Sequence, residues 1–416
     1  MRLWALALAS LRSRALTVGF TVVAVALSVA LFLGVEKVRT GARASFADTI
    51  SGTDLIIGAR TGGVQLLLYS VFRIGNATNN ITWESYQDVI ARPEVDWAVP
   101  ISLGDSHRQF RVMGTTQAFF DRYRYRGGRA LEMARGGRME DLFDAVIGAE
   151  VARALGYEVG DPIIVAHGLA SFVEHDDTPF RISGILEKTG TPVDRTVVVS
   201  LEAIEAIHVD WQGGGFDGTA TPVEEIRRMD LTPKAITAAL IGVKSRLQIF
   251  ALQRAVNEYR EEPLLAILPG VALQELWSLV GVAETALVAV SAMVVATSLL
   301  GMGAMLLAGL DARRREMAIL RALGAGPGVI AGLLVAEAAL MAAAGAALGT
   351  GLLYAGLAAA RPAVDAAFGL WLPLTAPTAW ELTVLGLVVL GAGVVALVPA
   401  VRAYRLSLAG GMMVKT

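Results

Sequence analysis

The chain has 416 residues, a formal net charge of −2 and no cysteine. Hydrophobic residues make up 54% of it and charged residues 18%, with a mean hydropathy of +0.55, which is too apolar for an ordinary soluble protein of this length. The lack of cysteine excludes disulfides, thiolate zinc sites, a cysteine nucleophile and a lipoprotein anchor.

Four long apolar runs predict membrane-spanning helices, because a bilayer core about 30 Å thick takes about 20 apolar residues. The runs are 15–35, 285–310, 326–360 and 382–401, and Glu337 is the only charge within them. A signal peptide has a shorter apolar stretch and a clear cleavage site, so we expect the first run to be a retained anchor. We therefore predict spans at 15–35, 276–310, 326–360 and 382–401.

Basic residues flank these runs unevenly. The segments before the first span, between the second and third, and after the fourth hold 10 basic and 2 acidic residues, whereas the rest of the chain holds 26 basic and 36 acidic residues. Because basic loops remain on the cytoplasmic side, we expect three cytoplasmic segments: the amphipathic N-terminal segment 1–14, the loop 311–325 and the tail 402–416. The region 36–275 and the loop 361–381 are then expected outside.

Region 36–275 is long enough for a folded domain with its own core. Short β-branched stretches alternate with helical ones, so we predict an α+β domain and leave its strand order open. The expected strands are 54–59, 161–166, 180–186, 196–200 and 235–243. The expected helices are 83–90, 148–155, 201–207 and 246–259. The apolar stretch 63–72 is a core element, part of a site for a lipophilic substrate, or a segment near the outer leaflet, and the core interpretation is favoured.

Three of the four histidines lie in one part of this domain. His167, His175 and His208, with Asp176 and Asp177 beside the second, have side chains that suit zinc or another borderline divalent metal. Their spacing matches no compact metal motif, and scattered loop histidines are common on protein surfaces. These five residues are candidate metal ligands, with exposed loop residues as the favoured alternative.

Motifs for chemistry are missing from the sequence. It contains no G-x-x-x-x-G-K-[ST], so no P-loop binds ATP phosphates, and it contains no G-x-S-x-G or H-E-x-x-H. The glycine-rich stretch 324–328 lacks the lysine of a P-loop. We therefore expect no catalytic residue and no cofactor site in this chain.

The third apolar run contains two features that bear on helix packing. Glu337 would be costly if it faced lipid. It is either part of a proton or ion relay or a carboxylate hydrogen-bonded inside the helix bundle, and the lack of a basic partner in the spans favours the second. Gly345 and Gly349 form a GxxxG pair, which permits a neighbouring helix to approach closely.

The loop 311–325 has the pattern of a short amphipathic helix. Met317, Leu320 and Leu323 share one stripe, with Ile319 at its flank, and Gly324 is placed to end the helix. Such a helix either lies on the lipid surface or docks into a groove on a soluble partner.

The run from Arg314 to Ala325 (RREMAILRALGA) resembles the loop after the second span in FtsX-like permeases of the MacB and LolC/LolE type. Stretches 146–166 and 180–204 also resemble ectodomain elements of that family. The resemblance implies that the loop couples the chain to an ATPase, through Arg313, Arg314, Arg315, Glu316, Met317, Ile319, Leu320, Arg321, Leu323 and Gly324.

The resemblance also implies an architecture and partners. It implies a type VII ABC permease of the bacterial inner membrane, with four transmembrane helices and a large α+β extracytoplasmic domain between the first two. ATP and Mg would bind a separate ATPase dimer, and the other expected partners are a second permease chain in a homodimer, membrane lipid and a periplasmic adaptor or binding protein, with no nucleic acid. The expected function is export or extraction of a periplasmic or outer-leaflet substrate. FtsX-like transmembrane signalling, or sensing of a ligand or metal by the ectodomain, remains the alternative.

Overall fold

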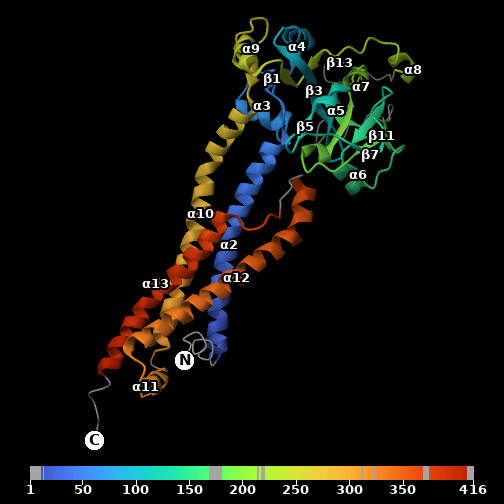
Figure 1. Cartoon of the computed structure of the whole chain (residues 1–416). Coiled ribbons are helices and arrows are strands. Elements are labelled where there is room, and N and C mark those ends of the chain that lie inside the picture. Colours follow the sequence, from blue (N-terminus) through green and yellow to red (C-terminus); the bar gives the residue numbers. More distant parts are fainter. Residues whose placement is uncertain are drawn as a thin grey trace. The chain divides into compact units, whose positions relative to one another are not determined.

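The computed structural model divides into two compact units, which are described separately (Figure 1). The residues that it describes are 11–12, 14–167, 180–212, 215–216, 221–310, 313–322, 324–368 and 374–409. The helical unit comprises 1–41, 281–362 and 372–416, and the sheet unit comprises 42–280 and 363–371.

Among the described residues, four helices are long and apolar enough to cross a membrane. They are α2 (Ala15–Thr49), α10 (Pro269–Ala308), α12 (Pro327–Phe368) and α13 (Ala379–Ala409). Each contains all or most of one predicted span. At 1.5 Å per residue, α2 is about 52 Å long and α10 about 60 Å, well beyond a hydrocarbon core of about 30 Å.

Helices α2 and α12 approach each other closely through glycine. A Cβ atom added at Gly345 would lie 2.7 Å from the Cβ of Val25, and one added at Gly349 would lie 2.4 Å from the carbonyl oxygen of Ala26. Neither distance is compatible with a real side chain, so the GxxxG prediction of a close helix approach is confirmed.

A buried ion pair also joins α2 to the start of α13 within the helical unit. The Nζ of Lys37 lies 3.1 Å from an Oε of Glu381 and 3.2 Å from the Oγ1 of Thr375. The hydroxyl of Tyr354, in α12, donates to the carbonyl oxygen of Thr375 at 2.6 Å. Three helices are therefore held together at this point by polar contacts, in addition to apolar packing.

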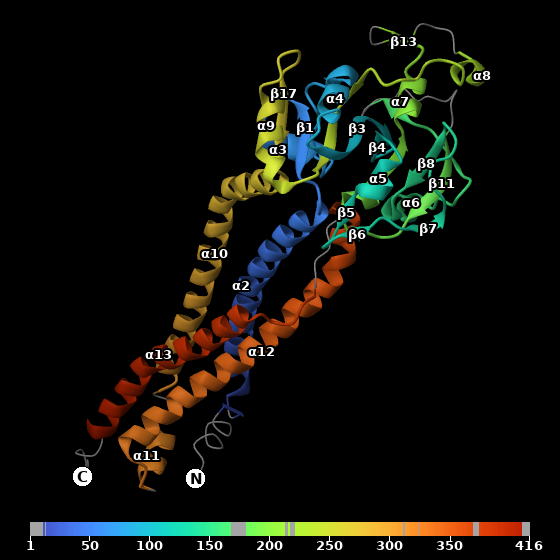
Figure 2. The same cartoon turned by 45° about the horizontal axis from the view of Figure 1, so that its top comes forward.

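The sheet unit is built on one mixed sheet, with strand order β17-β1-β16-β3-β4-β12-β8-β11-β7 (Figure 2). The pairs β4/β12 and β8/β11 are parallel, and the other pairs along this order are antiparallel. The strands are β1 (Leu55–Ala59), β3 (Val95–His107), β4 (Phe110–Thr115), β7 (Met133–Gly136), β8 (Asp144–Ile147), β11 (Phe180–Leu186), β12 (Thr196–Ser200), β16 (Ala238–Val243) and β17 (Leu264–Ile267).

Shorter strands add to this sheet or pair with each other. They are β2 (Ile81–Thr82), β5 (Arg124–Tyr125), β6 (Arg129–Ala130), β9 (Pro162–Ile163), β10 (Ala166–His167), β13 (Trp211–Gln212), β14 (Gly215–Phe216) and β15 (Ala235–Ile236). β10 pairs with β3 and β9 with β11, whereas β2/β15, β5/β6 and β13/β14 form separate pairs.

Helices pack on the sheet over three apolar clusters. They are α3 (Gly63–Ser70), α4 (Trp83–Ile90), α5 (Ala118–Arg122), α6 (Ala149–Leu155), α7 (Leu201–Ile207), α8 (Val223–Ile226) and α9 (Ile249–Asn257). One cluster joins the inner face of α3 to residues from the ends of α2 and α10, including Phe46 and Trp277, whose rings lie 5.5 Å apart. Leu66 and Leu67 of α3 are fully buried in it, so the core interpretation of 63–72 is confirmed.

Turns in the sheet unit follow the expected residue chemistry. Gly156 ends α6 in the left-handed conformation, with φ of 72°. Between β11 and β12, the buried carboxylate of Asp194 accepts hydrogen bonds from the backbone N–H and hydroxyl of Thr189 and from the backbone N–H of Gly190, at 2.6–2.8 Å. Asp194 therefore fixes the turn at 189–192.

Three expected strands and two expected helices differ from the structure in their bounds. The strand expected over 54–59 starts at Leu55. The stretch 161–166 forms two short strands, β9 and β10, and 235–243 is divided into β15 and β16 at Thr237. The helix expected from 148 starts at Ala149, because Gly148 is its N-cap. The helix expected over 246–259 starts with a 3₁₀ turn, Arg246–Gln248, before α9.

Candidate ATPase-coupling site

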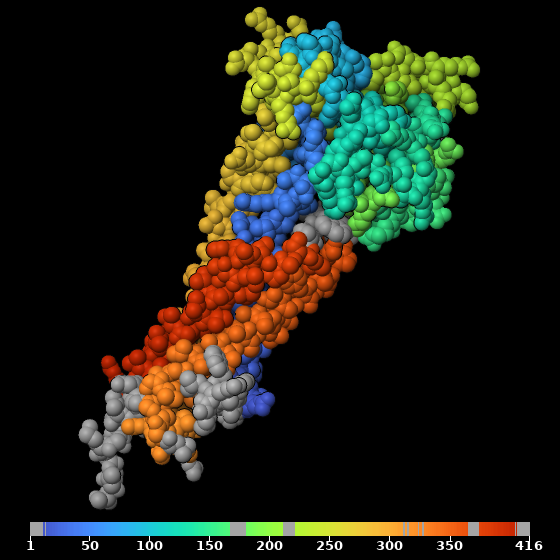
Figure 3. Space-filling model, viewed as in Figure 1, coloured from blue at the N-terminus to red at the C-terminus, as the bar shows by residue number. Residues whose placement is uncertain are grey.

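The predicted amphipathic loop contains helix α11 (Arg314–Ala322). The start of α2, helix α11 and the C-terminal end of α13 lie at the same end of the helical unit (Figure 1), and Figure 3 shows the α11 region at the surface there. This is the placement that the charge pattern predicts for segments sharing one side of a membrane.

Local chemistry gives α11 a defined beginning and end. At the beginning, the N–H of Met317 donates to the carbonyl oxygen of Arg313 at 2.9 Å. At the end, Gly324 has φ of 90°, its N–H donates to Arg321, and the N–H of Ala325 donates to Leu320. This pair of hydrogen bonds is a Schellman cap, so Gly324 ends the helix as predicted.

A buried ion pair anchors α11 to α12. The Nη2 of Arg313 donates to Oε1 of Glu337, and these residues are 4% and 1% exposed. The Nε of Arg313 also lies 3.8 Å from Oε2 of Glu316. Arg14 interacts electrostatically with Arg313, Glu316 and Glu337. Glu337 is therefore turned into the protein, and its basic partner comes from the loop before α11 rather than from a span.

The buried and exposed faces of α11 do not coincide with the apolar stripe predicted from the sequence. Met317 packs against the helical unit's own cluster around Ile330 and Leu334, and Leu320 is half-buried. Glu316 and Ile319 are exposed, and Ile319 has 54% of its surface accessible. Ile319, predicted at the flank of the stripe, is thus a large apolar side chain that α11 exposes. The side chains of Arg314, Arg315 and Leu323 lie outside the described residues.

The candidate metal ligands are placed only in part. His175, Asp176 and Asp177 lie outside the described residues, and for His167 only the backbone is described, paired with Asp105 across β10 and β3. Asp105 also lies 3.6 Å from the Nε2 of His208. Asp105 was therefore not among the residues predicted from the sequence. It lies on β3, a strand that was not predicted, and is next to both histidine positions.

The surroundings of His208 do not favour a metal. Burial by itself would lower the pKa of this histidine, but the Asp105 carboxylate and the carbonyl oxygen of Ile204, 2.6 Å from Nδ1, raise it above the ordinary value. A raised pKa favours imidazolium, whereas a metal binds neutral imidazole. Within the described part of the chain, no group of three or more histidine, aspartate or glutamate side chains forms a metal site.

Comparisons with known proteins identify the family. Residues 18–243 match the model of the MacB-like periplasmic core domain, and residues 288–408 match that of the FtsX-like permease C-terminal domain. Similar solved structures include the periplasmic region of MacB from Actinobacillus actinomycetemcomitans (10% identity, TM-score 0.33, covering 55% of this chain and 94% of that one). Another is the extracellular domain of the transporter YknZ from Gram-positive bacteria (13% identity, TM-score 0.31, covering 52% and 99%). The search of curated proteins finds no match. Because the first model alone matches more than half of the chain, the protein belongs to the MacB/FtsX-type family of ABC transporter permeases.

Proposed function

We propose that this permease couples ATP hydrolysis on a separate ATPase to work on a substrate in the periplasm or outer leaflet. The observation that carries the proposal is the course of α2 and α10. Each is one continuous helix with residues in both units, and neither contains proline after its first residue. A continuous α-helix transmits displacement along its axis, because its backbone hydrogen bonds resist stretching.

The proposed mechanism starts at α11. ATP-driven closure of the ATPase moves this helix, and the Arg313–Glu337 pair transfers the movement to α12, which packs on α2 through Gly345 and Gly349. Helices α2 and α10 carry it to the periplasmic domain, which is the sheet unit. ATP thus changes the populations of two conformations of the permease, as linkage requires.

The exposed apolar surface of α10 supports a second permease chain and lipid as partners. In its most apolar window only 6% of residues are buried within the chain, against 50% for α12. We propose a homodimer of permease chains on an ATPase dimer, with a periplasmic adaptor or binding protein as a further partner. Lipid or the second copy then covers α10.

A charge placed on the exposed face of α11 tests the coupling site. Ile319→Arg is expected to weaken binding of the ATPase that co-purifies with the wild-type chain by about 100-fold or more, because it puts an unpaired charge into an apolar contact. Stimulated ATP turnover should fall with it. Co-purification and ATP turnover in reconstituted vesicles measure the two effects.

Two matched variants control this experiment. Ile319→Leu retains the apolar contact and should bind the ATPase normally. Leu247→Arg adds the same charge to a side chain of the periplasmic domain that is 92% exposed, and should also have no effect. Normal binding by Ile319→Arg would exclude the exposed face of α11 as the docking surface.

Topology is tested with reporter fusions. We expect four spans with both termini in the cytoplasm, so a reporter at residue 150 and one at the C-terminus should report opposite sides of the inner membrane. The physical reason is the excess of basic residues beside the spans at one end. Reporters on the same side would disprove the proposed topology.

A further inference from the structure

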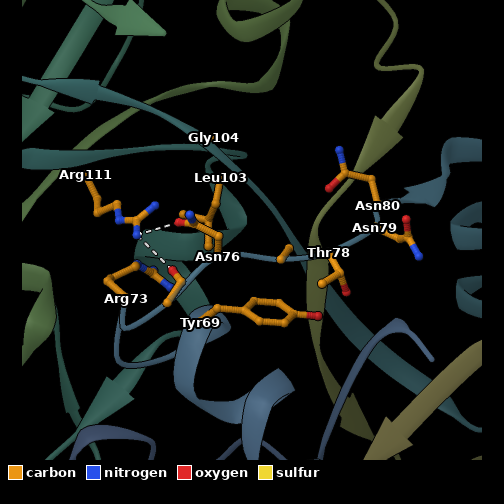
Figure 4. Close-up of a pocket in the computed structure, with 11 residues that line it drawn as sticks. Tyr69, Arg73, Asn76, Thr78, Asn79, Asn80, Leu103, Gly104 and Arg111 are labelled. Atoms are coloured by element: carbon orange, nitrogen blue, oxygen red, sulfur yellow. Dashed lines mark hydrogen bonds between the residues drawn. The ribbon is translucent and has the colours of Figure 1, made fainter. Parts of the chain in front are cut away.

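A pocket of about 250 Å³ lies in the periplasmic domain (Figure 4). Its walls are the end of α3, the following segment 71–80, and parts of β3 and β4. Arg73 and Arg111 lie on one side of it, and Thr78, Asn79 and Asn80 lie on the other (Figure 4). None of the described residues that line it is acidic.

The two arginines have only uncharged partners among the described residues. Nη2 of Arg111 donates to the carbonyl oxygen of Gly75 and to Oδ1 of Asn76, both at 2.8 Å. Arg73 donates to the carbonyl oxygen of Ser70 and contacts the sulfur of Met113, a weak acceptor, while its buried Nε has no partner in the described part of the chain. Two guanidinium groups therefore share a pocket without a carboxylate.

Two positive charges close together without a counter-charge are energetically costly. Burial lowers the pKa of Arg73 to about 10, and the positive charge of Arg111 adds to the lowering, although both groups keep their protons at neutral pH. Arg73 also has a left-handed backbone, with φ of 60°, which is uncommon for a residue other than glycine. An oxyanion between the two guanidinium groups would relieve the charge repulsion and accept the unused N–H donors.

The positive lining of this pocket contrasts with the charge of the rest of the chain. Outside the three basic segments beside the spans, the chain has 26 basic and 36 acidic residues. A second pocket of the same domain, of about 550 Å³, is lined by Glu140, Asp141 and Glu202. The lining of the first pocket is therefore basic, whereas that of the second is acidic.

We propose that the Arg73–Arg111 pocket binds an oxyanion, as the phosphate group of a phosphorylated small molecule or of a lipid headgroup. Arg73 and Arg111 bind the charge, and the amide groups of Asn76, Asn79 and Asn80 supply further donors. This ligand site is independent of the coupling helix, so binding requires neither ATP nor the ATPase.

Isothermal titration of the full-length chain in a non-ionic detergent tests the site, with inorganic phosphate as the probe at constant ionic strength set by chloride. We expect saturable binding, weakened at least about tenfold by Arg111→Gln, because a hydrogen bond between two charged groups is lost. Arg135→Gln removes the same charge from an exposed arginine outside the pocket and should bind as the wild type does.

Arg73→Gln should weaken phosphate binding similarly. If its unusual backbone prevents that variant from folding, Arg111→Gln decides, because Arg111 stands on the regular strand β4. Two outcomes overturn the proposal: no phosphate binding by the wild type up to about 10 mM, or unchanged binding by a folded Arg111→Gln variant. Since no ATPase is present, either outcome leaves the proposed coupling function untouched.

Competition distinguishes the two sources of phosphate. If sn-glycerol 3-phosphate displaces inorganic phosphate and micellar phosphatidylglycerol does not, the ligand is a soluble phosphate ester. If phosphatidylglycerol displaces it and phosphatidylcholine, whose headgroup is neutral overall, does not, the ligand is a lipid headgroup. Both results require Arg111 and support the site.

Discussion

Glu337→Ala is expected to destabilise the full-length chain in detergent by about 3–5 kcal/mol, the range for breaking a buried ion pair. The variant leaves the guanidinium of Arg313 buried without its main carboxylate, and Glu316, 3.8 Å away and exposed, is too distant and too hydrated to replace it. Because Arg313 immediately precedes α11, stimulated ATP turnover should fall as well. Thermal unfolding followed by tryptophan fluorescence measures the first effect.

A double-mutant cycle separates the ion pair from general damage. Arg313→Leu with Glu337→Leu replaces both charges by apolar groups, so it should be more stable than Glu337→Ala alone. Glu337→Gln retains the shape of the side chain and one hydrogen-bond acceptor. Its stability should therefore lie between those of the wild type and Glu337→Ala. Additive effects of the two single leucine substitutions would show that Arg313 and Glu337 are not energetically coupled.

Gly349→Leu is expected to destabilise the helical unit by about 3 kcal/mol, at the upper end of the range for overpacking. The reason is geometric: a Cβ at this position meets the carbonyl oxygen and backbone carbons of Ala26 at 2.4–3.1 Å, and backbone cannot move aside as a side chain can. Helices α2 and α12 would have to separate along their contact. The unfolding midpoint in detergent measures the loss.

Two substitutions control for the added bulk. Gly351→Leu lies two residues further along the same helix, where a new Cβ meets nothing within 4 Å, and should cost little. The loss of stability in Gly349→Ala should lie between the losses in Gly351→Leu and Gly349→Leu. Equal stability of Gly349→Leu and Gly351→Leu would mean that the close α2–α12 contact does not stabilise the protein.

Strands with strong local signals could be predicted well from the sequence. Strands β11 and β12 are β-branched runs bounded by turn residues, and their ends match the prediction at 180–186 and 196–200. β3 was missed because it contains Pro100 and Gly104, residues that normally argue against a strand. Its long pairing with β16 and β4 overrides this local preference, and a single sequence does not reveal such pairing.

The candidate coupling site could likewise be predicted only in part. The existence of α11 and its stop at Gly324 follow from local pattern, since amphipathicity and a glycine cap need no tertiary information. Which face of α11 is exposed depends on the neighbouring cluster around Ile330, which covers Met317 and leaves Ile319 accessible. The partner of Glu337 could not be predicted from the sequence either, because Arg313 is 24 residues away along the chain.

The pairing of β1 with β17 bears on how the periplasmic domain could be exchanged during evolution. Ile56 lies opposite Ile267 in that pair, so the chain enters and leaves the sheet on adjacent strands, about 5 Å apart. More than 200 residues thus begin and end at nearly one point, the geometry under which one domain is inserted into another. Exchange of this domain for another with neighbouring ends would preserve the spacing at which α2 and α10 meet it. Under the proposed function, substrate choice and ATP coupling could therefore evolve separately, the first by replacement of the inserted domain and the second by retention of the helices.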